Sequence, residues 1–373
     1  MDESAEEPAA AGNEGTDPGG QDRGLAAFRM LAPGGFAEAL AEATCRGGSV
    51  IVTDRTVRRL FGHLFPSGVP VLEMGEGEAS KTLASAEALC ADFLRLDIDR
   101  QSLIVAVGGG VVCDVASFAA SIWMRGVRCG LFPTTLLAQA DAGLGGKCGV
   151  NFCGGKNLLG TVRPHAFCLC DPAFLAALPR RERSSGLAEI AKMACLYDAE
   201  LFRFLEENAT ALLAGSLESL SLAVRRSLEL KAAIVSADPF ERGVRRQLNL
   251  GHTIGHAVEA ASTLGHGESV ALGMRLAALW SLERGDLPQS DVRRLDSLLD
   301  ALELPELSRL EALDMAAVCR LLGADKKRQG ESVRFVALRG IGLGRDAVRV
   351  EPVALSTLSR WLAEKARGLG AAL

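Results

Sequence analysis

Residues 103–118 read "LIVAVGGGVVCDVASF", an apolar run that ends in three glycines and continues into a helical pattern. The run predicts a buried strand over 103–109, and the glycines indicate a tight turn that opens a helix. Such a turn lets a phosphate group approach the backbone N–H groups at the helix N-terminus. Because the stretch lacks the complete GxGxxG pattern, an ordinary strand-to-helix turn is the alternative. Asp114 is predicted in the first helical turn, where a carboxylate favours the helix dipole.

Similar apolar runs lie on both sides of this stretch, and helical patterns such as 79–96 separate them. Strands that alternate with helices indicate a Rossmann-like α/β domain whose parallel sheet is covered on both faces. Ligands of such sheets bind beyond the carboxyl ends of the strands. The further predicted strands are 49–54, 69–74, 128–133 and 166–170.

Helical periodicity dominates after about Pro179, so we expect a mostly α-helical second domain. Only 333–338 and 347–353 have strand patterns there, and we expect them to form a small hairpin. The beginning of the chain is acidic and rich in glycine, proline and alanine, which is typical of a disordered tail and not of a signal peptide. The expected division is a tail over 1–23, an α/β domain over 24–180 and a helical domain over 181–373.

The composition excludes several classes of protein. A chain of 373 residues with a net charge of −5 lacks the basic character of a general nucleic-acid or membrane-surface binder. No stretch of about 18 apolar residues predicts a membrane span. The ten cysteines are scattered without a dense framework, so we expect reduced thiols and a cytoplasmic location.

Two Gly-Gly-Lys triplets within 133–160 predict an anion site in the first half of the chain. The glycines free the backbone, and Lys147 and Lys156 end the two triplets. Solvated loop lysines are the alternative. Asp54 ends a predicted strand, where an acid can bind a ribose hydroxyl, although an ordinary helix cap is also consistent. Other polar residues of this region are Glu78, Lys81, Thr134, Thr135, Asp141 and Asn157.

Three of the five histidines gather within the stretch "LNLGHTIGHAVEAASTLGHGE", residues 248–268. His252 and His256 are four residues apart on one helix face, and His266 follows a predicted turn. Imidazoles and a carboxylate are typical ligands of a catalytic metal, with hydrogen-bonded core histidines as the alternative. Spacing alone leaves open which two of the three bind metal. In "SGLAEIAKMACL" (185–196), Glu189 is a candidate third ligand and Lys192 a candidate anion contact, or the two form a surface ion pair.

Positively charged residues accompany each of these motifs although the chain is acidic. If they converge, the ligand carries at least two negative charges. Asn249 and the pair Lys326-Lys327 are further polar residues that could contact such a ligand. The cations concerned are Arg125, Lys147, Lys156, Lys192, Lys231 and Arg245.

Taken together, the motifs resemble the 3-dehydroquinate synthase family of sugar-phosphate cyclases from about Val50 to Gly342. The resemblance rests on "GGGVVCDVASFAA", "MRGVR", "PTTLLAQADAGLGGKCGVN", "GKNLLG", "GLAEIAK", "LNLGHTIGHAVE", "HGESVALGM" and "DKK", in this order. It implies an N-terminal NAD-binding α/β domain and a mostly helical C-terminal metal-binding domain. It also implies NAD and Zn²⁺ as cofactors, with Co²⁺ as an alternative metal, and a homodimer.

The resemblance further assigns roles to individual residues. Glu189, His252 and His266 would hold Zn²⁺, and His256 would contact substrate. Cys113, Cys148 and Ala177 depart from the family pattern. NAD contacts would come from Asp54, Glu78, Lys81, Gly109, Gly110, Val111, Asp114, Thr134, Thr135, Leu137, Asp141, Lys147, Lys156 and Leu178. Substrate contacts would come from Arg125, Asp141, Lys147, Asn157, Lys192, Lys231, Arg245, Asn249, His256 and Lys326 or Lys327.

The implied activity is a phosphate-eliminating cyclisation, the carbon–oxygen lyase step of the shikimate pathway that supplies aromatic amino acid biosynthesis. The substrate would be 3-deoxy-D-arabino-heptulosonate 7-phosphate, and the product 3-dehydroquinate. The implied steps are transient oxidation by NAD, β-elimination of phosphate, reduction and intramolecular aldol closure. Three alternatives are another sugar-phosphate cyclase, a metal-dependent alcohol dehydrogenase of the glycerol dehydrogenase type, and a non-catalytic scaffold. The Gly-Gly-Lys block argues against the dehydrogenase, and the Glu-His-His set argues against the scaffold.

Overall fold

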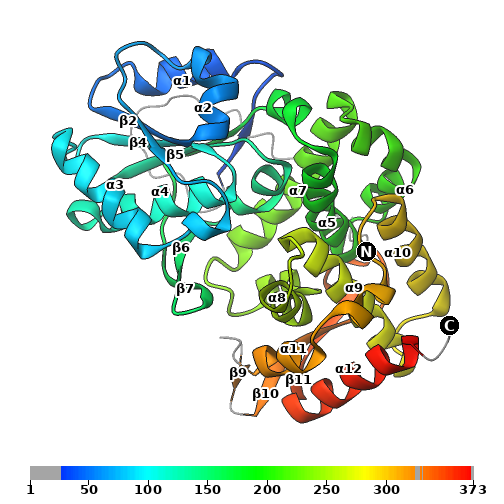
Figure 1. Cartoon of the computed structure of the whole chain (residues 1–373). Helices are drawn as coiled ribbons and strands as arrows, with labels where there is room; N and C mark the ends of the chain where they lie inside the picture. The colour runs from blue at the N-terminus through cyan, green and yellow to red at the C-terminus, as the bar shows by residue number, and fades with distance from the viewer. Residues whose placement is uncertain (1–26, 324–327, 330, 371–373) are drawn as a thin grey trace, which may run out of the picture.

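The computed structural model describes residues 27–323, 328–329 and 331–370. The predicted tail over 1–23 therefore lies outside the described residues, as do Lys326 and Lys327. The chain forms an α/β half followed by a mostly helical half, and both are visible in Figure 1. The fold class expected from the sequence is confirmed.

A six-stranded sheet with the order β1-β8-β5-β4-β2-β3 forms the first half, and every pair of neighbouring strands is parallel. From β2 the chain continues to β3 at one edge, and it then returns to β4 and proceeds toward the other edge. The strand order thus reverses between β2 and β4, the position where open α/β sheets bind ligands. The strands are β1 (Arg29–Met30), β2 (Ser49–Asp54), β3 (Val71–Met74), β4 (Leu103–Gly108), β5 (Arg128–Pro133) and β8 (Phe167–Cys170).

Alternating side chains of the central strands are buried on opposite faces of this sheet. In β4, Val105 packs with the cluster that includes Phe36 and Val57, whereas Ile104 packs with the cluster that includes Phe93 and Val115. Figure 1 shows the corresponding helices on the two sides of the sheet. Burial on both faces explains why the strands read as continuous apolar runs. The helices are α1 (Phe36–Thr44) and α2 (Arg55–Phe61) on one face, and α3 (Leu83–Arg95) and α4 (Gly110–Ile122) on the other.

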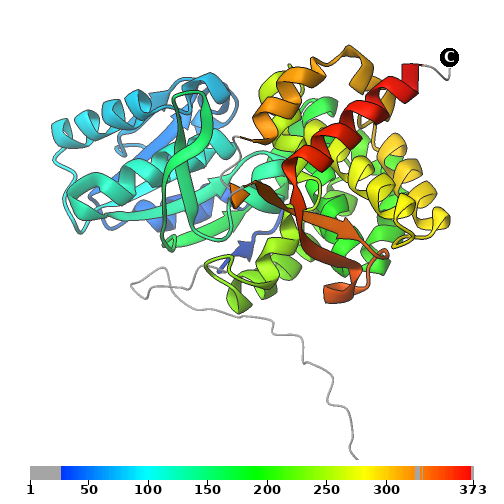
Figure 2. The same ribbon diagram turned by 90° about the horizontal axis from the view of Figure 1, so that it is seen from below.

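A two-stranded antiparallel hairpin, β6 (Lys147–Phe152) and β7 (Gly155–Val162), was not predicted. It begins at Lys147, the last residue of the first Gly-Gly-Lys triplet, and it contains the second triplet at its turn, so its glycine content resembles that of a loop. The hairpin extends away from the six-stranded sheet, beside α3 and α4 (Figure 2). It therefore carries Lys147, Lys156 and Asn157 on one ordered element.

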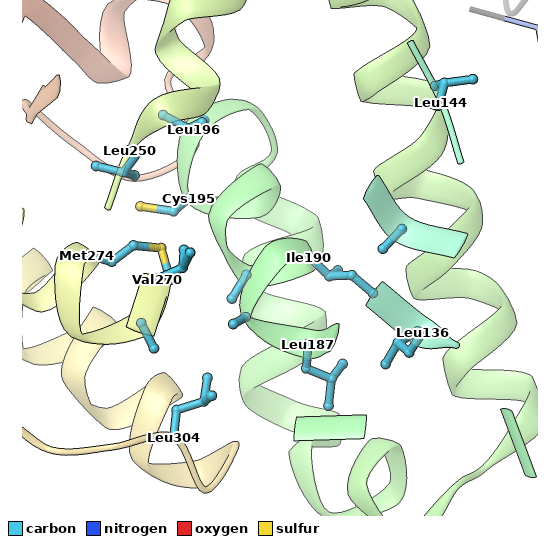
Figure 3. Packing of buried hydrophobic residues seen from close by; sticks show 14 of the residues in the cluster. Leu136, Leu144, Leu187, Ile190, Cys195, Leu196, Leu250, Val270, Met274 and Leu304 are labelled. Carbon is cyan, nitrogen blue, oxygen red and sulfur yellow. The ribbon is translucent and has the colours of Figure 1, made fainter. Parts of the chain in front are cut away.

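The helical half is organised around α5 (Arg180–Tyr197), whose residues from Leu187 to Leu196 are all buried. Figure 3 shows Val270 and Met274 of α9 on one side of α5 and Leu136 on the other. The last strand of the sheet ends at Cys170, ten residues before α5 begins. The remaining helices are α6 (Ala199–Ala214), α7 (Leu217–Ala237), α8 (His252–Ala261), α9 (His266–Glu283), α10 (Gln289–Ala301), α11 (Met315–Leu322) and α12 (Leu355–Gly370).

The hairpin predicted near the end of the chain is confirmed as β10 (Ser332–Leu338) and β11 (Val348–Ala354), which pair antiparallel. The short strand β9 (Arg328–Gln329) adds a third member to this sheet. Among the helices that the structure describes, none combines the length and the apolar character needed to cross a membrane.

The stability of the fold is expected to depend on the protonation of His165, which lies just before β8. Its Nε2 is 3.1 Å from the hydroxyl of Ser117, and burial lowers the pKa of His165 from 6.5 to about 4. The unfolded chain binds this proton near pH 6.5 and the folded chain only near pH 4. The contribution to stability is thus present above pH 6.5 and is lost as the pH falls toward 4.

We expect that loss to be about 1–2 kcal/mol, since the ring is only half-buried and solvent screens part of the shift. Urea unfolding of the wild-type protein and of His165→Gln at about pH 7.5 and about pH 4.5 checks this expectation. The variant should lose less stability between the two pH values. An identical pH dependence in both proteins would contradict the prediction.

Candidate active site

The glycine turn at the end of β4 lies at the reversal of strand order. Gly109 is the residue before α4 and Gly110 is its first residue, so their backbone lies at the N-terminus of a 13-residue helix. Asp54, at the end of neighbouring β2, caps α2 by accepting a hydrogen bond from the Val57 N–H at 2.8 Å. β2 thus ends at the Asp54 carboxylate and β4 ends at the glycine turn, and the two strands are neighbours in the sheet. This is the arrangement that accommodates a nucleotide phosphate in open α/β sheets.

Asp114 does not lie in the first turn of α4, contrary to the prediction. Because α4 begins at Gly110, the first turn contains no acidic residue, and the Asp114 carboxylate instead forms an ion pair with Lys81 at 2.5 Å. Glu78, three residues before Lys81, accepts a hydrogen bond from Asn151 of β6 and lies 3.6 Å from the Lys156 ammonium group. These pairs connect the sheet to the β6–β7 hairpin.

The other predicted nucleotide contacts lie on the segments that follow β5 and β8. The N–H of Thr134 donates to the Gly108 carbonyl at 2.9 Å, and the Thr135 hydroxyl accepts from the Ala138 N–H at 3.2 Å. Val111 is the second residue of α4, and Leu137 precedes the single-turn π-helix Ala138–Ala142. Leu178, whose carbonyl accepts from Arg183, lies just before α5.

Glu189, His252 and His266 converge from three helices, α5, α8 and α9. Glu189 Oε1 lies 3.5 Å from His252 Nε2 and 3.2 Å from His266 Nε2, and one ligand atom from each residue lies within 4.8 Å of the others. The Glu189 side chain is 1% exposed. The donor set, one carboxylate and two imidazoles, is the kind that holds a divalent transition metal with an open position.

The ring nitrogens that face away from Glu189 are both engaged. His252 Nδ1 is 3.0 Å from the carbonyl of Leu250, and His266 Nδ1 is 3.2 Å from Glu259 Oε2. Both contacts favour a proton on Nδ1, which leaves Nε2 of each ring, on the side of Glu189, to bind either a second proton or a metal ion. Among the residues that the structure describes, His252 and His256, which are four residues apart, belong to no common group of three possible ligands. His256 instead groups with Glu259 and His266.

The electrostatic field at this cluster favours positive charge. Burial alone raises the pKa of Glu189, but the charge of Lys192, the hydrogen bond to His266 and the charge of His266 outweigh it and hold that pKa below its usual range. Burial alone lowers the pKa of His266, but the hydrogen bonds and charges of Glu189 and Glu259 raise it to about 10. A site that stabilises a proton between two carboxylates also stabilises a divalent cation there.

A second cluster, of buried cations, adjoins the first. Lys192 and Lys231 are 2% and 5% exposed, and the sequence alternative of a surface pair between Glu189 and Lys192 is wrong because both are buried. The Lys231 ammonium group lies 2.7 Å from Asp141 Oδ1. Burial lowers the pKa of Lys231, and Asp141 opposes this shift while Lys192 and Arg245 add to it.

Close packing of α5 brings these two clusters into contact. A Cβ added at Gly186 would lie 2.6 Å from Leu136 Cβ and 2.8 Å from the backbone nitrogen of Leu137. A glycine therefore lets α5 approach the segment that leads to Asp141. The charge of Glu189 correspondingly affects the pKa of Asp141, although burial and Lys231 have the larger effects.

Glu241 and Glu259 take part in the site but were absent from the predicted set. Glu241 forms an ion pair with Lys147 and accepts a hydrogen bond from Asn249 Nδ2 at 2.6 Å. Its φ of 56° is a left-handed conformation, which is uncommon for a residue other than glycine. No local pattern in the sequence singles out either glutamate, although Glu259 lies seven positions before His266 on the histidine stretch.

Other predicted contacts are not brought into the clusters. Arg125 is exposed on the turn after α4, where its φ is 66°. It forms no ion pair with any acidic residue in the described part of the chain. Asn157 lies on the hairpin, where its N–H donates to Asn151 Oδ1 at 2.9 Å. Cys113 and Cys148, which depart from the family pattern, are both buried, whereas Ala177 is exposed.

Two family models match consecutive parts of the chain. "3-dehydroquinate synthase N-terminal" matches residues 71–185, and "3-dehydroquinate synthase C-terminal" matches residues 186–328. A 3-dehydroquinate synthase from Rhodopseudomonas palustris is 41% identical over 324 residues, which cover 82% of this chain and 84% of the relative. The chain belongs to the 3-dehydroquinate synthase family. The predicted family and the predicted lyase activity are confirmed.

Further relatives and solved structures agree with this assignment. The 3-dehydroquinate synthase of Halorhodospira halophila is 39% identical and covers 87% of this chain and 92% of the relative. Among solved structures, the 2-epi-5-epi-valiolone synthase of Streptomyces hygroscopicus, with NAD⁺ and Zn²⁺ bound, has a TM-score of 0.81 at 28% identity, covering 93% of this chain and 97% of that one. A 2-deoxy-scyllo-inosose synthase, complexed with carbaglucose-6-phosphate, NAD⁺ and Co²⁺, has a TM-score of 0.78 at 27% identity and covers 90% of this chain and 96% of that one.

The fold is shared more widely. A probable glycerol dehydrogenase from Sinorhizobium meliloti has a TM-score of 0.65 at 16% identity, covering 92% of this chain and 96% of that one. At this identity the similarity concerns the fold alone. The alternative of a dehydrogenase therefore gains no support from it.

Proposed function

We propose that the chain converts 3-deoxy-D-arabino-heptulosonate 7-phosphate to 3-dehydroquinate and phosphate in the space bounded by the two clusters. The convergence of Glu189, His252 and His266 beside buried Lys192 and Lys231 is the observation that carries this proposal. A substrate with one carboxylate and one phosphate is bound most strongly by several cations that are shielded from water. Lys192 and Lys231, which are 2% and 5% exposed, are shielded in this way.

NAD would bind at the glycine turn of β4, between the ends of β2 and β4. Gly109 and Gly110 leave the N-terminus of α4 open to a pyrophosphate, and Lys81 and Lys156 supply charge nearby. When bound, NAD supplies reversible hydride transfer. Both cyclases of similar structure described above have NAD⁺ bound, which supports the assignment for this chain.

Glu189, His252 and His266 would hold one divalent cation, Zn²⁺ or alternatively Co²⁺. The donor set suits either metal, and the two Nδ1 contacts, to Leu250 and Glu259, orient the rings. When bound, the metal supplies Lewis-acid polarisation of substrate oxygens. Both solved cyclases contain such an ion.

The remaining residues bind and orient the substrate. Lys192, Lys231 and Arg245 would neutralise its anionic groups, and Asp141 keeps Lys231 in place through their ion pair. Lys147, Asn157 and Asn249 would contact substrate from the hairpin and from the segment before α8. His256, with its ring centroid 5.1 Å from that of His252, would move a proton at the substrate.

We also propose a cytoplasmic homodimer with domain limits of 24–180 and 181–373. The ten cysteines are all free thiols, which is consistent with a reducing compartment. Four exposed apolar residues near the end of α3 and the end of α4 are candidates for a surface between subunits. They are Leu94, Leu96, Ile122 and Met124.

The proposed reaction predicts phosphate release from the heptulosonate phosphate with only catalytic amounts of NAD⁺. The nucleotide returns to its oxidised form in each turnover, so NADH should not accumulate while 3-dehydroquinate forms. Phosphate assays, absorbance of NADH and chromatography of the product measure the three quantities together. NADH formed in proportion to phosphate would instead indicate a dehydrogenase, and turnover of a hexose or heptulose phosphate without a carboxylate would indicate another cyclase.

A further inference from the structure

Glu259 is the more deeply buried of the two acidic residues in the histidine stretch, and it was not among the predicted site residues. It lies on α8, its side chain is 8% exposed, and both of its oxygens have partners. Oε2 lies 3.2 Å from His266 Nδ1, and Oε1 lies 2.6 Å from the ammonium group of Lys156 on the β6–β7 hairpin.

His266 needs an external group to hold its ring. It is the first residue of α9, and the group that its Nδ1 contacts lies on another helix, at Glu259 of α8. His252 also begins its helix, α8, and the Leu250 carbonyl orients its ring through Nδ1. Glu259 occupies the equivalent position at Nδ1 of His266. The two imidazoles are therefore held in the same way, one by a carbonyl and the other by a carboxylate.

We propose that Glu259 is a positioning residue that fixes the ring of His266 for the metal at Glu189, His252 and His266. The carboxylate keeps one imidazole proton on Nδ1, so that Nε2, which lies on the side of Glu189, is the nitrogen available to the metal. Its negative charge also makes Nε2 a stronger donor to a cation. Lys156 completes this arrangement, because it neutralises the carboxylate and ties it to the hairpin.

A different role for Glu259 is a direct metal ligand, since one ligand atom each from His256, Glu259 and His266 also lies within 4.8 Å of the others. The contacts favour positioning. Glu259 faces Nδ1 of His266, whereas Nε2 of the same ring faces Glu189, and the second oxygen of Glu259 is bound by Lys156. Nε2 of His266 and Nε2 of His252 thus both face Glu189 Oε1, whereas Glu259 lies at the other nitrogen of the His266 ring.

The inference rests on the proposed metal site, so the test measures metal binding directly and not only turnover. The metal-free proteins are titrated with Co²⁺ alone, and the absorption of the bound ion and the dissociation constant are recorded. The proteins are the wild type, Glu259→Gln, Glu189→Gln and Glu303→Gln. Glutamine keeps the shape of the side chain and removes the charge. Glu303 is the matched control, because it forms an exposed ion pair with Arg180 on the surface. Urea unfolding of the metal-free proteins verifies that each variant folds.

We expect wild type and Glu303→Gln to bind one Co²⁺ with the same affinity, and Glu259→Gln to bind one Co²⁺ roughly 10- to 100-fold more weakly with an altered absorption band. Unchanged affinity and absorption in Glu259→Gln would overturn the inference and leave the proposed metal site intact. Complete loss of binding in Glu259→Gln, equal to that in Glu189→Gln, would make Glu259 a ligand and overturn its positioning role. If the wild-type protein binds no Co²⁺, the proposed metal site fails and this inference fails with it.

Discussion

Replacing Glu189 by glutamine is expected to abolish stable metal binding and to lower turnover by on the order of 10³-fold or more. The carboxylate supplies the only negative charge among the three proposed ligands, and both imidazoles face it through Nε2. The amide that replaces it is neutral and competes poorly for a cation. Metal content after dialysis against a chelator and then against Zn²⁺ measures the first effect, and phosphate release measures the second.

The matched comparison is His256→Ala, for which we expect wild-type metal content together with slower turnover. His256 lies within 5.1 Å of His252, centroid to centroid, but belongs to a different group of possible ligands. Glutamine is preferred to alanine at position 189, because its amide oxygen can still accept a hydrogen bond from the buried Lys192 ammonium group, whereas alanine would leave that group without this partner. Equal metal loss in the two variants would show that the ligand set is assigned incorrectly.

Much of the α/β half could be predicted because burial on both faces leaves a plain signal in the sequence. The predicted strand over 49–54 has the same limits in the structure, and the strand over 128–133 does as well. The β6–β7 hairpin could not be predicted in this way. Its strands contain glycines at 149, 155 and 160 and alternate weakly in polarity, so they lack the apolar run on which the other predictions depend.

The sequence draws attention to the rare residue types of the proposed site, but it does not show the contacts that depend on the folded chain. Histidines are rare in this chain, so three within a short stretch attract notice. Helix periodicity places His252 and His256 on one helix face, but it cannot show that α5 and the start of α9 approach each other. Glu259 and Glu241 escaped prediction for a similar reason: acidic residues are common, and only the folded chain brings these two to His266 and Lys147.

Adding one methyl group at Gly267 is expected to damage both the fold and the site. A Cβ there would lie 2.0 Å from the carbonyl oxygen of Ser185 and 2.6 Å from its carbonyl carbon, so the first turn of α9 touches the backbone of α5. Gly267 follows His266, and Ser185 lies one turn before Glu189 on α5. The methyl group must therefore push α9 away from α5 close to the contact between Glu189 Oε1 and His266 Nε2, which are 3.2 Å apart.

We expect Gly267→Ala to lower the free energy of unfolding of the metal-free protein by about 3 kcal/mol, since an overpacked backbone contact has little room to relax. Its affinity for Co²⁺ should fall by at least about 10-fold, because the ligands move apart. The control is Gly265→Ala, two residues earlier on the same segment, where φ is −69° and the nearest atom, Glu268 Oε2, is 3.4 Å from an added Cβ. That variant should lose less than about 1 kcal/mol and bind Co²⁺ like the wild type. If both alanine variants behave alike in urea unfolding and in the Co²⁺ titration, then the contact between α5 and α9 does not set the distance between Glu189 and His266.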